Sequence, residues 1–304
     1  MRLNSAFLYT STAAIIWGAT APIMKLTLEQ IPPFSLAFLR FSIAAIILGA
    51  LTYKINRSLR PLKIHERDLP DFVLCALTGV TLNISFFFLG LKFTEAILAS
   101  FIIAAVPLLT LLAANIFLKE KFTKRLIIAS AFAFSGLLLI VGKVNGTLGT
   151  RELFGNILLL GSAASWVAYE IFSKKLFKKY DANTITFYTM AIGALTFAPL
   201  FFAELVRDPT WTAIVNIKGL AGLFYGIFFS SLIAYISWNK GLKLMRANQA
   251  AFFFYLDPIS GAALSILLLG EKLTPQLLMG GTLIAAAVVL AEKHREAHIL
   301  HKRA

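Results

Sequence analysis

The chain repeats itself about halfway along, and this internal repeat constrains its fold more than any other feature. Two blocks match at a spacing of 151 positions: Gly90-Leu91-Lys92, Ala96, Phe101, Pro107 and Glu120-Lys121 recur as Gly241-Leu242-Lys243, Ala247, Phe252, Pro258 and Glu271-Lys272. Nearer the start of each half the spacing is 149: Ala14, Trp17, Ala19, Lys25 and Phe38 recur as Ala163, Trp166, Ala168, Lys174 and Phe187. Such a repeat predicts two copies of one structural unit.

The composition identifies a membrane protein. Apolar residues make up 58% of the chain, charged residues 14%, and the mean hydropathy is +0.78, whereas a soluble domain carries about 25% charged residues. Ten apolar stretches are each near the ~20 residues that cross a bilayer. We therefore predict an all-α polytopic protein with ten transmembrane helices, at 5–25, 33–53, 70–92, 95–118, 125–142, 154–173, 183–203, 218–239, 247–269 and 275–292.

The repeat divides these helices into two units of five, at 1–142 and 154–292, followed by a basic tail at 293–304. Because five is odd, the second unit enters the bilayer from the face opposite to the first. The units are thus predicted to be inverted repeats, an arrangement typical of transporters with a site near the bilayer midplane.

The distribution of the 29 lysines and arginines predicts the orientation. Most lie in the loops on one side, with the termini, and the positive-inside rule places that side in the cytoplasm. The pI near 9.9 therefore reflects topology in the inner or plasma membrane rather than nucleic-acid binding. Arg2 and the apolar run after it resemble a signal peptide, but this run matches the sixth helix, so we expect it to be retained.

Residues typical of enzymes are missing from the predicted spans. The four histidines lie in loops or the tail, and Cys75 is the single cysteine. This pattern argues against an intramembrane metal site and leaves no recognisable catalytic triad. No phosphate-binding P-loop occurs in the sequence either. We expect no cofactor and no enzymatic activity.

The repeated motifs resemble those of the drug/metabolite transporter superfamily, in particular its EamA-type branch of bacterial metabolite exporters, including aromatic amino-acid exporters. The resemblance covers nearly the whole chain as two EamA-like units. It rests on Trp17-Gly18, Pro22 and Lys25, on Arg40, on the run from Ala96 through Pro107 to Glu120, and on Leu256-Asp257-Pro258 with Leu269-Gly270-Glu271-Lys272. It implies secondary transport, often export of amino acids and related metabolites, by alternating access around a central cavity.

The two most costly charges each occur in one copy only, and they are the leading candidates for the site. Asp257 lies in mid-span next to Pro258 and corresponds to Val106 in the first copy. A carboxylate in mid-span costs about 2.5–3.5 kcal/mol on insertion scales. Asp257 is interpreted as a proton-coupling or substrate-amine site, or alternatively as a structural acid at a proline kink or a partner of Arg40.

Arg40 corresponds to Thr189 in the second copy. Its guanidinium can bind a substrate carboxylate bidentately. It can also be paired permanently with Asp257, or reach outward to the membrane interface.

Several uncharged residues are further candidates for the cavity wall. The equivalent tryptophans Trp17 and Trp166 lie away from the ends of their spans, where interfacial tryptophans are expected. With Tyr235, Trp238 and Tyr255 they can line an amphipathic cavity, or simply pack between helices. Asn83 lies in mid-span and can contact substrate or bond between helices.

Four charged residues are predicted at the ends of the spans. Lys25 and Glu271 are expected at the outer ends of their helices, and Lys174 and Glu120 at the inner ends. Because the repeat makes these two pairs equivalent, we interpret each as the salt bridge of one gate. The alternative is anchoring at the membrane interface. Glu170, four residues before Lys174, is interpreted as its local helical partner.

Two transport functions remain open, together with a distant third class. The first is outward transport of a small metabolite, an amino acid or an aromatic compound, in which protons are possible partners. The second is efflux or exchange of a lipophilic cation, with Asp257 as counter-charge. If Arg40 faces the cavity, the second is disfavoured, because an unpaired arginine repels a cation. A polytopic membrane enzyme is the third possibility, and the oligomeric state stays open.

Overall fold

The computed structural model describes residues 2–119, 124–141 and 149–301. All secondary structure in these ranges is helical. The elements are α1 (Arg2–Thr27), α2 (Pro33–Asn56), η1 (Arg60–Leu62), η2 (Glu66–Asp68), α3 (Leu69–Ala76), η3 (Leu77–Leu82), α4 (Asn83–Leu91), α5 (Ala96–Ile103), α6 (Val106–Leu118), α7 (Lys124–Val141), α8 (Thr150–Leu176), α9 (Ala182–Arg207), α10 (Trp211–Ile214), α11 (Ile217–Phe224), η4 (Tyr225–Ile233), α12 (Ala234–Leu244), α13 (Ala247–Ala251), η5 (Phe252–Leu256), α14 (Asp257–Leu269) and α15 (Pro275–His301).

Seven helical segments in the described ranges are long and apolar enough to cross a bilayer: Ser5–Thr27, Pro33–Asn56, Glu66–Leu91, Ala96–Leu118, Ala182–Arg207, Ile217–Leu244 and Ala247–Leu269. The protein is therefore a multi-pass membrane protein. The predicted spans at 125–142, 154–173 and 275–292 correspond to α7, α8 and α15. Helix α15 also runs on into the predicted basic tail, as far as His301.

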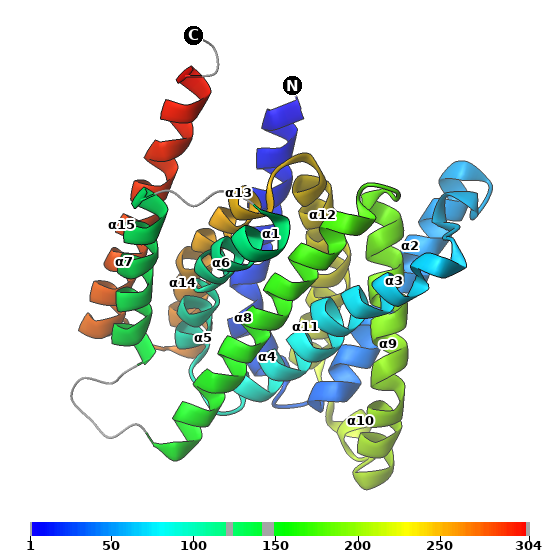
Figure 1. The fold of residues 1–304 in the computed structure, drawn as a ribbon. Helices are drawn as coiled ribbons and strands as arrows, with labels where there is room; N and C mark the ends of the chain where they lie inside the picture. Colours follow the sequence, from blue (N-terminus) through cyan, green and yellow to red (C-terminus); the bar gives the residue numbers. More distant parts are fainter. Residues whose placement is uncertain (1, 120–123, 142–148, 302–304) are drawn as a thin grey trace.

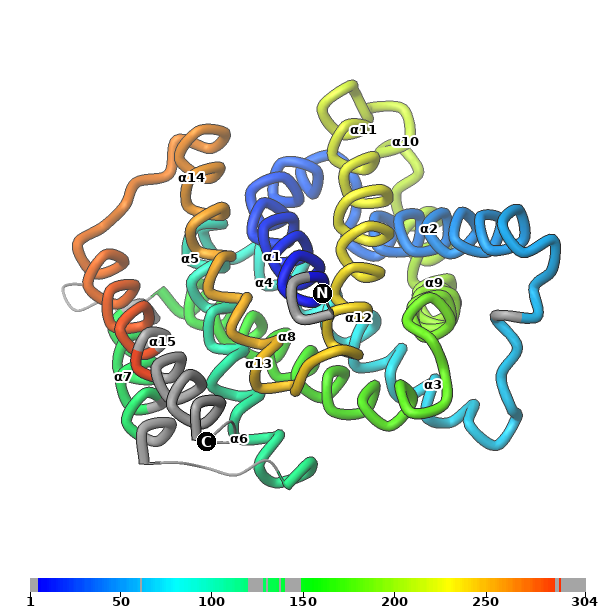
Figure 2. The backbone as a smooth tube through the Cα atoms, turned by 90° about the horizontal axis from the view of Figure 1, so that it is seen from above, coloured from blue at the N-terminus to red at the C-terminus, as the bar shows by residue number. Residues whose placement is uncertain are grey.

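The helices form a bundle with one helix pair on each flank (Figures 1 and 2). Helices α2 and α9 pack together on one flank, and α7 and α15 pack together on the other. The start of α1 and the end of α15 lie at the same end of the bundle (Figure 1). Between the flanks, α1 packs against α12 and α14, while α8 packs against α4 and α6. The two halves of the chain are thus interleaved rather than side by side.

A glycine shared by the two copies permits close approaches between the halves. A Cβ atom on Gly90 in α4 would lie 3.0 Å from the carbonyl oxygen of Gly155 in α8. A Cβ atom on the equivalent Gly241 in α12 would lie 3.3 Å from the carbonyl oxygen of Ala6 in α1. Small residues that let helix backbones approach are typical of membrane bundles, where dispersion contacts replace the hydrophobic effect between helices.

Two helices of the bundle contain π-helical segments at equivalent positions. Segment η3 joins α3 to α4, and η4 joins α11 to α12. A π-helical turn shifts the backbone hydrogen bonds by one residue, so carbonyl groups become available to other partners, and such turns are frequent at functional sites.

Two further helices are interrupted near their middle, in each case next to a proline. Helices α5 and α6 are separated at Ala104 and Ala105, and the 3-10 segment η5 separates α13 from α14. Pro107 and Pro258 occupy the first turns of α6 and α14. Proline suits this position because the first helical N–H groups have no partner within the helix. The prolines therefore start new half-helices in the bundle interior.

The N-termini of α2 and α9 are capped in different ways. Asp181 caps its own helix, α9, by accepting a hydrogen bond from the Thr184 backbone N–H at 2.8 Å. Helix α2 begins at Pro33 without a side-chain cap of its own. Instead Glu204, near the end of α9, accepts from the backbone N–H groups of Phe34 and Ser35 at 3.3 and 2.7 Å. A carboxylate at this place also interacts favourably with the helix dipole.

Candidate functional site

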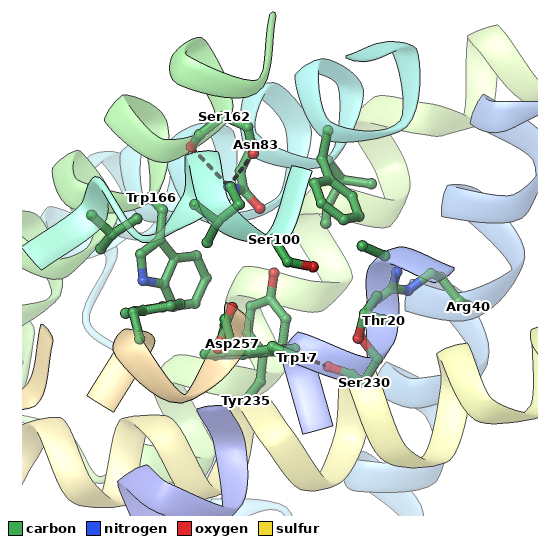
Figure 3. A pocket seen from close by; sticks show the side chains of 16 residues that line it. Trp17, Thr20, Arg40, Asn83, Ser100, Ser162, Trp166, Ser230, Tyr235 and Asp257 are labelled. Carbon is green, nitrogen blue, oxygen red and sulfur yellow. Dashed lines mark hydrogen bonds between the residues drawn. The ribbon is translucent and has the colours of Figure 1, made fainter. Parts of the chain in front are cut away.

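A cavity lies in the middle of the bundle, where the two interrupted helices meet α1, α2 and α8 (Figure 3). Its volume is about 70 Å³. Its lining has two charged, six polar and eight apolar or aromatic residues. The charged residues are Arg40 and Asp257, the polar ones are Thr20, Asn83, Ser100, Ser162, Ser230 and Tyr235, and the others are Trp17, Ala21, Ile84, Phe87, Ile103, Val106, Trp166 and Phe254.

Arg40 reaches the cavity from α2 and is 1% exposed. Its Nε donates to the Ser231 hydroxyl at 2.9 Å, and Nη2 donates to the Ser230 hydroxyl at 3.0 Å. The guanidinium also lies 4.7 Å from the ring centroid of Phe41, a cation–π contact. The third nitrogen, Nη1, is buried without a hydrogen-bond partner. An unsatisfied donor of this kind is costly in a buried site.

Asp257 is the first residue of α14 and is 3% exposed. An acid in the first turn interacts favourably with the helix dipole, which offsets part of the cost of its burial. Its Oδ1 is buried without a hydrogen-bond partner. The equivalent position in the first copy, Val106, starts α6 and also lines the cavity, so the two half-helices present different chemistry at matching places.

The two opposite charges line one cavity without pairing. No ion pair joins Arg40 to a carboxylate within the described ranges, and the Arg40 hydrogen bonds that lie there go to serine hydroxyls. Of the interpretations that the sequence leaves open for Arg40, the geometry thus favours a cation held by neutral hydroxyl acceptors over a permanent partner of Asp257. Arg40 and Asp257 each keep one polar atom that a solute could satisfy.

The two equivalent tryptophans meet across the cavity. The rings of Trp17 and Trp166 are 4.8 Å apart in an edge-to-face contact, and Tyr235 lies 5.3 and 5.5 Å from them. Aromatic pairs in this geometry contribute about 0.5–1.5 kcal/mol beyond their buried area. The cavity therefore has an aromatic wall to which both halves of the chain contribute.

The π-helical segments help to hold this wall. The indole N–H of Trp17 donates to the Ser230 carbonyl in η4 at 3.0 Å, and the Tyr235 hydroxyl donates to the Gly79 carbonyl in η3 at 2.8 Å. Gly79 and Ser230 are equivalent positions in the two copies. Each π segment thus offers the same carbonyl to an aromatic side chain from the other half of the chain.

The other predicted site residues lie at different distances from the cavity. Asn83 lines it and donates to the Ser162 carbonyl and hydroxyl at 2.9 and 3.0 Å, which joins α4 to α8. Trp238 is completely buried behind the wall, 4.6 Å from the ring of Phe254. Tyr255 packs against a separate apolar cluster formed by α5, α14 and α15. For all the predicted site residues, including Trp238 and Tyr255, substrate contact stays a prediction.

The predicted ion pair between Lys25 and Glu271 is present at one end of the bundle. Lys25 Nζ lies 3.2 Å from Glu271 Oε1 and donates to the Thr94 carbonyl at 2.8 Å. The same carboxylate accepts from the backbone N–H groups of Ala96 and Ile97 at 3.0 and 2.8 Å, at the start of α5. Glu271 thus has two roles, as the partner of Lys25 and as the N-terminal cap of α5.

Lys174, the equivalent of Lys25, lies at the opposite end of the bundle. It donates to the backbone carbonyls of Leu242 and Met245. Met245 is the equivalent of Thr94, so the two lysines bind matching carbonyls. Glu120, its predicted partner, lies outside the described residues. Glu170 is not exposed, and its carboxylate accepts from Thr110 and Trp166.

The close contact between α1 and α14 depends on Gly18. A Cβ atom at this position would lie 2.7 Å from the Asp257 carbonyl oxygen and 2.8 Å from its Cα, and these backbone atoms cannot move without shifting the start of α14. We expect Gly18→Ala to lower stability by about 1–3 kcal/mol, as overpacking does, and to displace Asp257. Thermal unfolding and solute binding would measure both effects. Gly149→Ala is the matched control, since nothing lies within 4 Å of its Cβ.

Comparison with known proteins identifies the family. The family model described as "EamA-like transporter family" matches residues 4–142 and again residues 153–292. The chain belongs to this family. It is a transporter of the EamA type in the drug/metabolite transporter superfamily, rather than an enzyme, in agreement with the sequence analysis.

Relatives of this EamA-type transporter match along nearly its whole length. An "Uncharacterized transporter" of Archaeoglobus fulgidus is 29% identical over 96% of this chain and 99% of its own. A protein of Escherichia coli named "Probable amino-acid metabolite efflux pump" is 25% identical over 91% of each chain. A solved crystal structure matches with a TM-score of 0.70 at 19% identity, over 96% of both chains, which supports the fold alone.

Proposed function

We propose that this EamA-type transporter moves a small zwitterionic metabolite, an amino acid or a related aromatic compound, outward by secondary transport. The observation that carries the proposal is the pair of unsatisfied, oppositely charged groups in one cavity. Arg40 Nη1 offers a donor for a solute carboxylate, and Asp257 Oδ1 offers an acceptor for a solute ammonium. Charge-assisted hydrogen bonds of this kind are roughly twice as strong as neutral ones.

The same geometry disfavours a lipophilic cation as the solute. Arg40 lines the cavity and has no carboxylate partner within the described ranges. A solute with a positive charge and no carboxylate would leave this guanidinium unneutralised and close to a second cation. The aromatic wall suits the apolar part of either solute, so the charges decide between the two classes.

We propose that the chain consists of two inverted five-helix units, at 1–142 and 154–292, with both termini in the cytoplasm. The equivalent π segments, the equivalent helix interruptions and the matching contacts of Lys25 and Lys174 support this arrangement. The start of α1 and the end of α15 lie at one end of the bundle, as the orientation predicted from lysine and arginine requires. The outward direction is inferred from the name of the Escherichia coli relative.

The cavity has to widen during transport. Its volume of about 70 Å³ is about half of the ~150 Å³ that holds a benzene molecule in an engineered cavity, so an aromatic amino acid does not fit. We interpret the structure as a closed state, with the Lys25–Glu271 pair formed at one end and Lys174 on its carbonyls at the other. Alternating access then opens one end at a time.

Thermal shift with defined solutes tests the proposed substrate class, because a ligand that binds the folded state raises its apparent stability. We expect aromatic amino acids to raise the melting temperature of the purified protein. Decarboxylated amines and amino-acid amides should raise it far less, since they leave Arg40 unsatisfied. Nucleosides and quaternary ammonium compounds complete the panel, and a shift by the latter alone would favour the cation alternative.

Asp257 is the proposed coupling site, where a proton and the solute ammonium compete for one carboxylate. Asp257→Asn should therefore lose the pH dependence of concentrative transport in proteoliposomes but retain solute counterflow. If concentrative transport by this variant keeps its full pH dependence, the coupling site lies elsewhere.

A further inference from the structure

A second carboxylate in the interior has no role in the cavity just described. Glu170 in α8 is 0% exposed. The Thr110 hydroxyl donates to its Oε2 at 2.6 Å, and the Trp166 indole N–H donates to its Oε1 at 3.2 Å. Both carboxylate oxygens are thus held by neutral donors, one of which belongs to the cavity wall. A buried carboxylate is costly in a membrane protein and is by default a candidate for proton transfer.

The Glu170 site occurs in one copy of the repeat only. Ala21 is the equivalent of Glu170, and Gly261 is the equivalent of Thr110. The equivalent tryptophan, Trp17, donates instead to a backbone carbonyl. The contact between the Glu170 carboxylate in α8 and the Thr110 hydroxyl in α6 therefore has no counterpart in the other half. The packing of the shared scaffold does not require it.

Glu170 lies between the cavity and the end of the bundle held by Lys174. On one side it binds Trp166, whose ring lines the cavity. On the other side Lys174 follows one helical turn later in α8 and donates to the Leu242 and Met245 carbonyls. Side chains four residues apart on a helix are neighbours, so the ammonium of Lys174 stabilises an ionised Glu170.

Within the described ranges, Lys174 is the charged residue that interacts electrostatically with Glu170. Helix α6 presents the neutral Thr110, and α4, α5, α13 and η3 carry no charged residue. The charged residues of α3 and α12, which also pack on α8, are engaged elsewhere: Asp71 with Lys175, Lys240 with the Tyr9 ring, and Lys243 with the Tyr180 carbonyl.

We propose that Glu170 is a proton-binding site, separate from Asp257, that links the cavity wall at Trp166 to the gate at Lys174. The inference rests on the proposed alternating-access function. When the gate opens, Lys174 leaves its carbonyls and its field at Glu170 weakens. An ionised carboxylate buried without a nearby cation is costly, so it takes up one proton from the water that enters. Closure of the gate releases that proton.

Protonation also changes the contact with the cavity wall. A neutral carboxylic acid donates one hydrogen bond, which Thr110 can accept by rotating its hydroxyl. The Trp166 indole then donates to a neutral oxygen rather than to a carboxylate, and this hydrogen bond is weaker. Trp166 is thereby loosened in the same step in which the gate opens, which allows the cavity to widen on that side.

Infrared difference spectra of the solute-free protein, recorded in lipid between alkaline and acidic buffer, test the proton-binding site directly. We expect a carbonyl band of a protonated, buried carboxylic acid that disappears in Glu170→Gln and persists in Asp257→Asn. Glu29→Gln, at an exposed position, is the matched control. Thr110→Val keeps the carboxylate and should move the frequency of the band, which still identifies Glu170 if the glutamine variant does not fold.

Access to the cavity tests the link to the gate. In a Cys75→Ala background, Ile103→Cys places a thiol on the cavity wall. We expect acidification to increase labelling from the Lys174 end roughly tenfold, within the usual range of coupling between sites. Rates are corrected by those of Lys178→Cys, an exposed position at the Lys174 end. Glu170→Gln, which imitates the protonated form, should label fast at every pH.

These outcomes separate the inference from the proposed function. If the carboxylic band survives in Glu170→Gln, or if labelling of this variant keeps the native pH dependence, Glu170 is not the proposed site. Neither measurement uses a solute. If the band and the labelling behave as expected while no zwitterion binds, the substrate proposal fails and the proton site stands.

Discussion

Arg40→Met is expected to reduce binding of a carboxylate-bearing solute about 100-fold or more, without lowering the stability of the solute-free protein. The loss of affinity follows from two charge-assisted hydrogen bonds, one from each N–H group of Nη1. Each contributes about 1.5–3 kcal/mol, where about 1.4 kcal/mol is tenfold. Methionine fills a similar volume and removes the buried, unsatisfied Nη1. The Ser230 hydroxyl keeps its hydrogen bond from Thr20 at 3.2 Å. We therefore expect an unchanged or raised melting temperature.

The sign of the stability change distinguishes two roles of Arg40. A structural partner of Asp257 would, on replacement, leave a buried carboxylate alone, and breaking a buried pair costs about 3–5 kcal/mol. If Arg40 instead binds substrate, its unsatisfied Nη1 is unfavourable in the empty site, and replacing Arg40 raises the stability of the solute-free protein. Solute binding and thermal unfolding of the same preparations give both quantities.

Two further variants complete the Arg40 experiment. Arg40→Lys keeps the charge but lacks the planar fork of donors, so we expect intermediate affinity. Arg207→Met removes an exposed arginine at the end of α9 and should leave binding unchanged. A marked loss of stability in Arg40→Met with binding retained would contradict the proposed role.

Comparison of the two copies predicts much of the site from sequence. The second copy has Thr189 at the position of Arg40, and the first copy has Val106 at the position of Asp257. The shared scaffold therefore does not need these two charges, and the structure brings both to one cavity. Glu170 is likewise a charge found in one copy only, since the equivalent residue is Ala21. Its spacing of four from Lys174 suggests a surface pair, and only the packing of α6 against α8 reveals that its carboxylate is buried.

Other features have no signal in the sequence. The π-helical segments η3 and η4 differ from α-helix by a shift of backbone hydrogen bonds, which leaves no mark in composition or periodicity. Glu204 caps α2 from the far end of another helix, and this depends on how α2 and α9 are aligned. Serine hydroxyls as partners of Arg40 likewise follow from tertiary packing, since serine is also common where helices merely approach closely.

Lys25→Met is expected to open the end of the cavity that Lys25 closes, roughly 8- to 30-fold more often than in the native protein. The estimate combines a partly exposed ion pair, about 0.2–1 kcal/mol, with a hydrogen bond to the Thr94 carbonyl of about 1 kcal/mol. The Lys25 and Glu271 side chains are 29% and 10% exposed, which limits the first contribution. Labelling of Ile103→Cys in the Cys75→Ala background, with an impermeant maleimide applied from outside, measures this opening.

Exchanging the two charges does not test this gate. Glu271 also accepts two backbone hydrogen bonds at the start of α5, and a lysine at position 271 has no acceptor for them. The double variant would therefore fail even if the ion pair were the gate. Replacing Lys25 alone leaves the cap of α5 in place, so a change in labelling reports on the gate.

Lys174→Met is the matched variant at the opposite end, and the two together test alternating access. If one conformational equilibrium links both ends, opening the Lys174 end withdraws molecules from the state open at the Lys25 end. Labelling from outside should then rise in Lys25→Met and fall, or stay low, in Lys174→Met. A rise in both variants would mean that the ends open independently, as in a channel. No change in either would reduce both lysines to anchors at the membrane interface, and alternating access would have to be sought in the interrupted helices around Pro107 and Pro258.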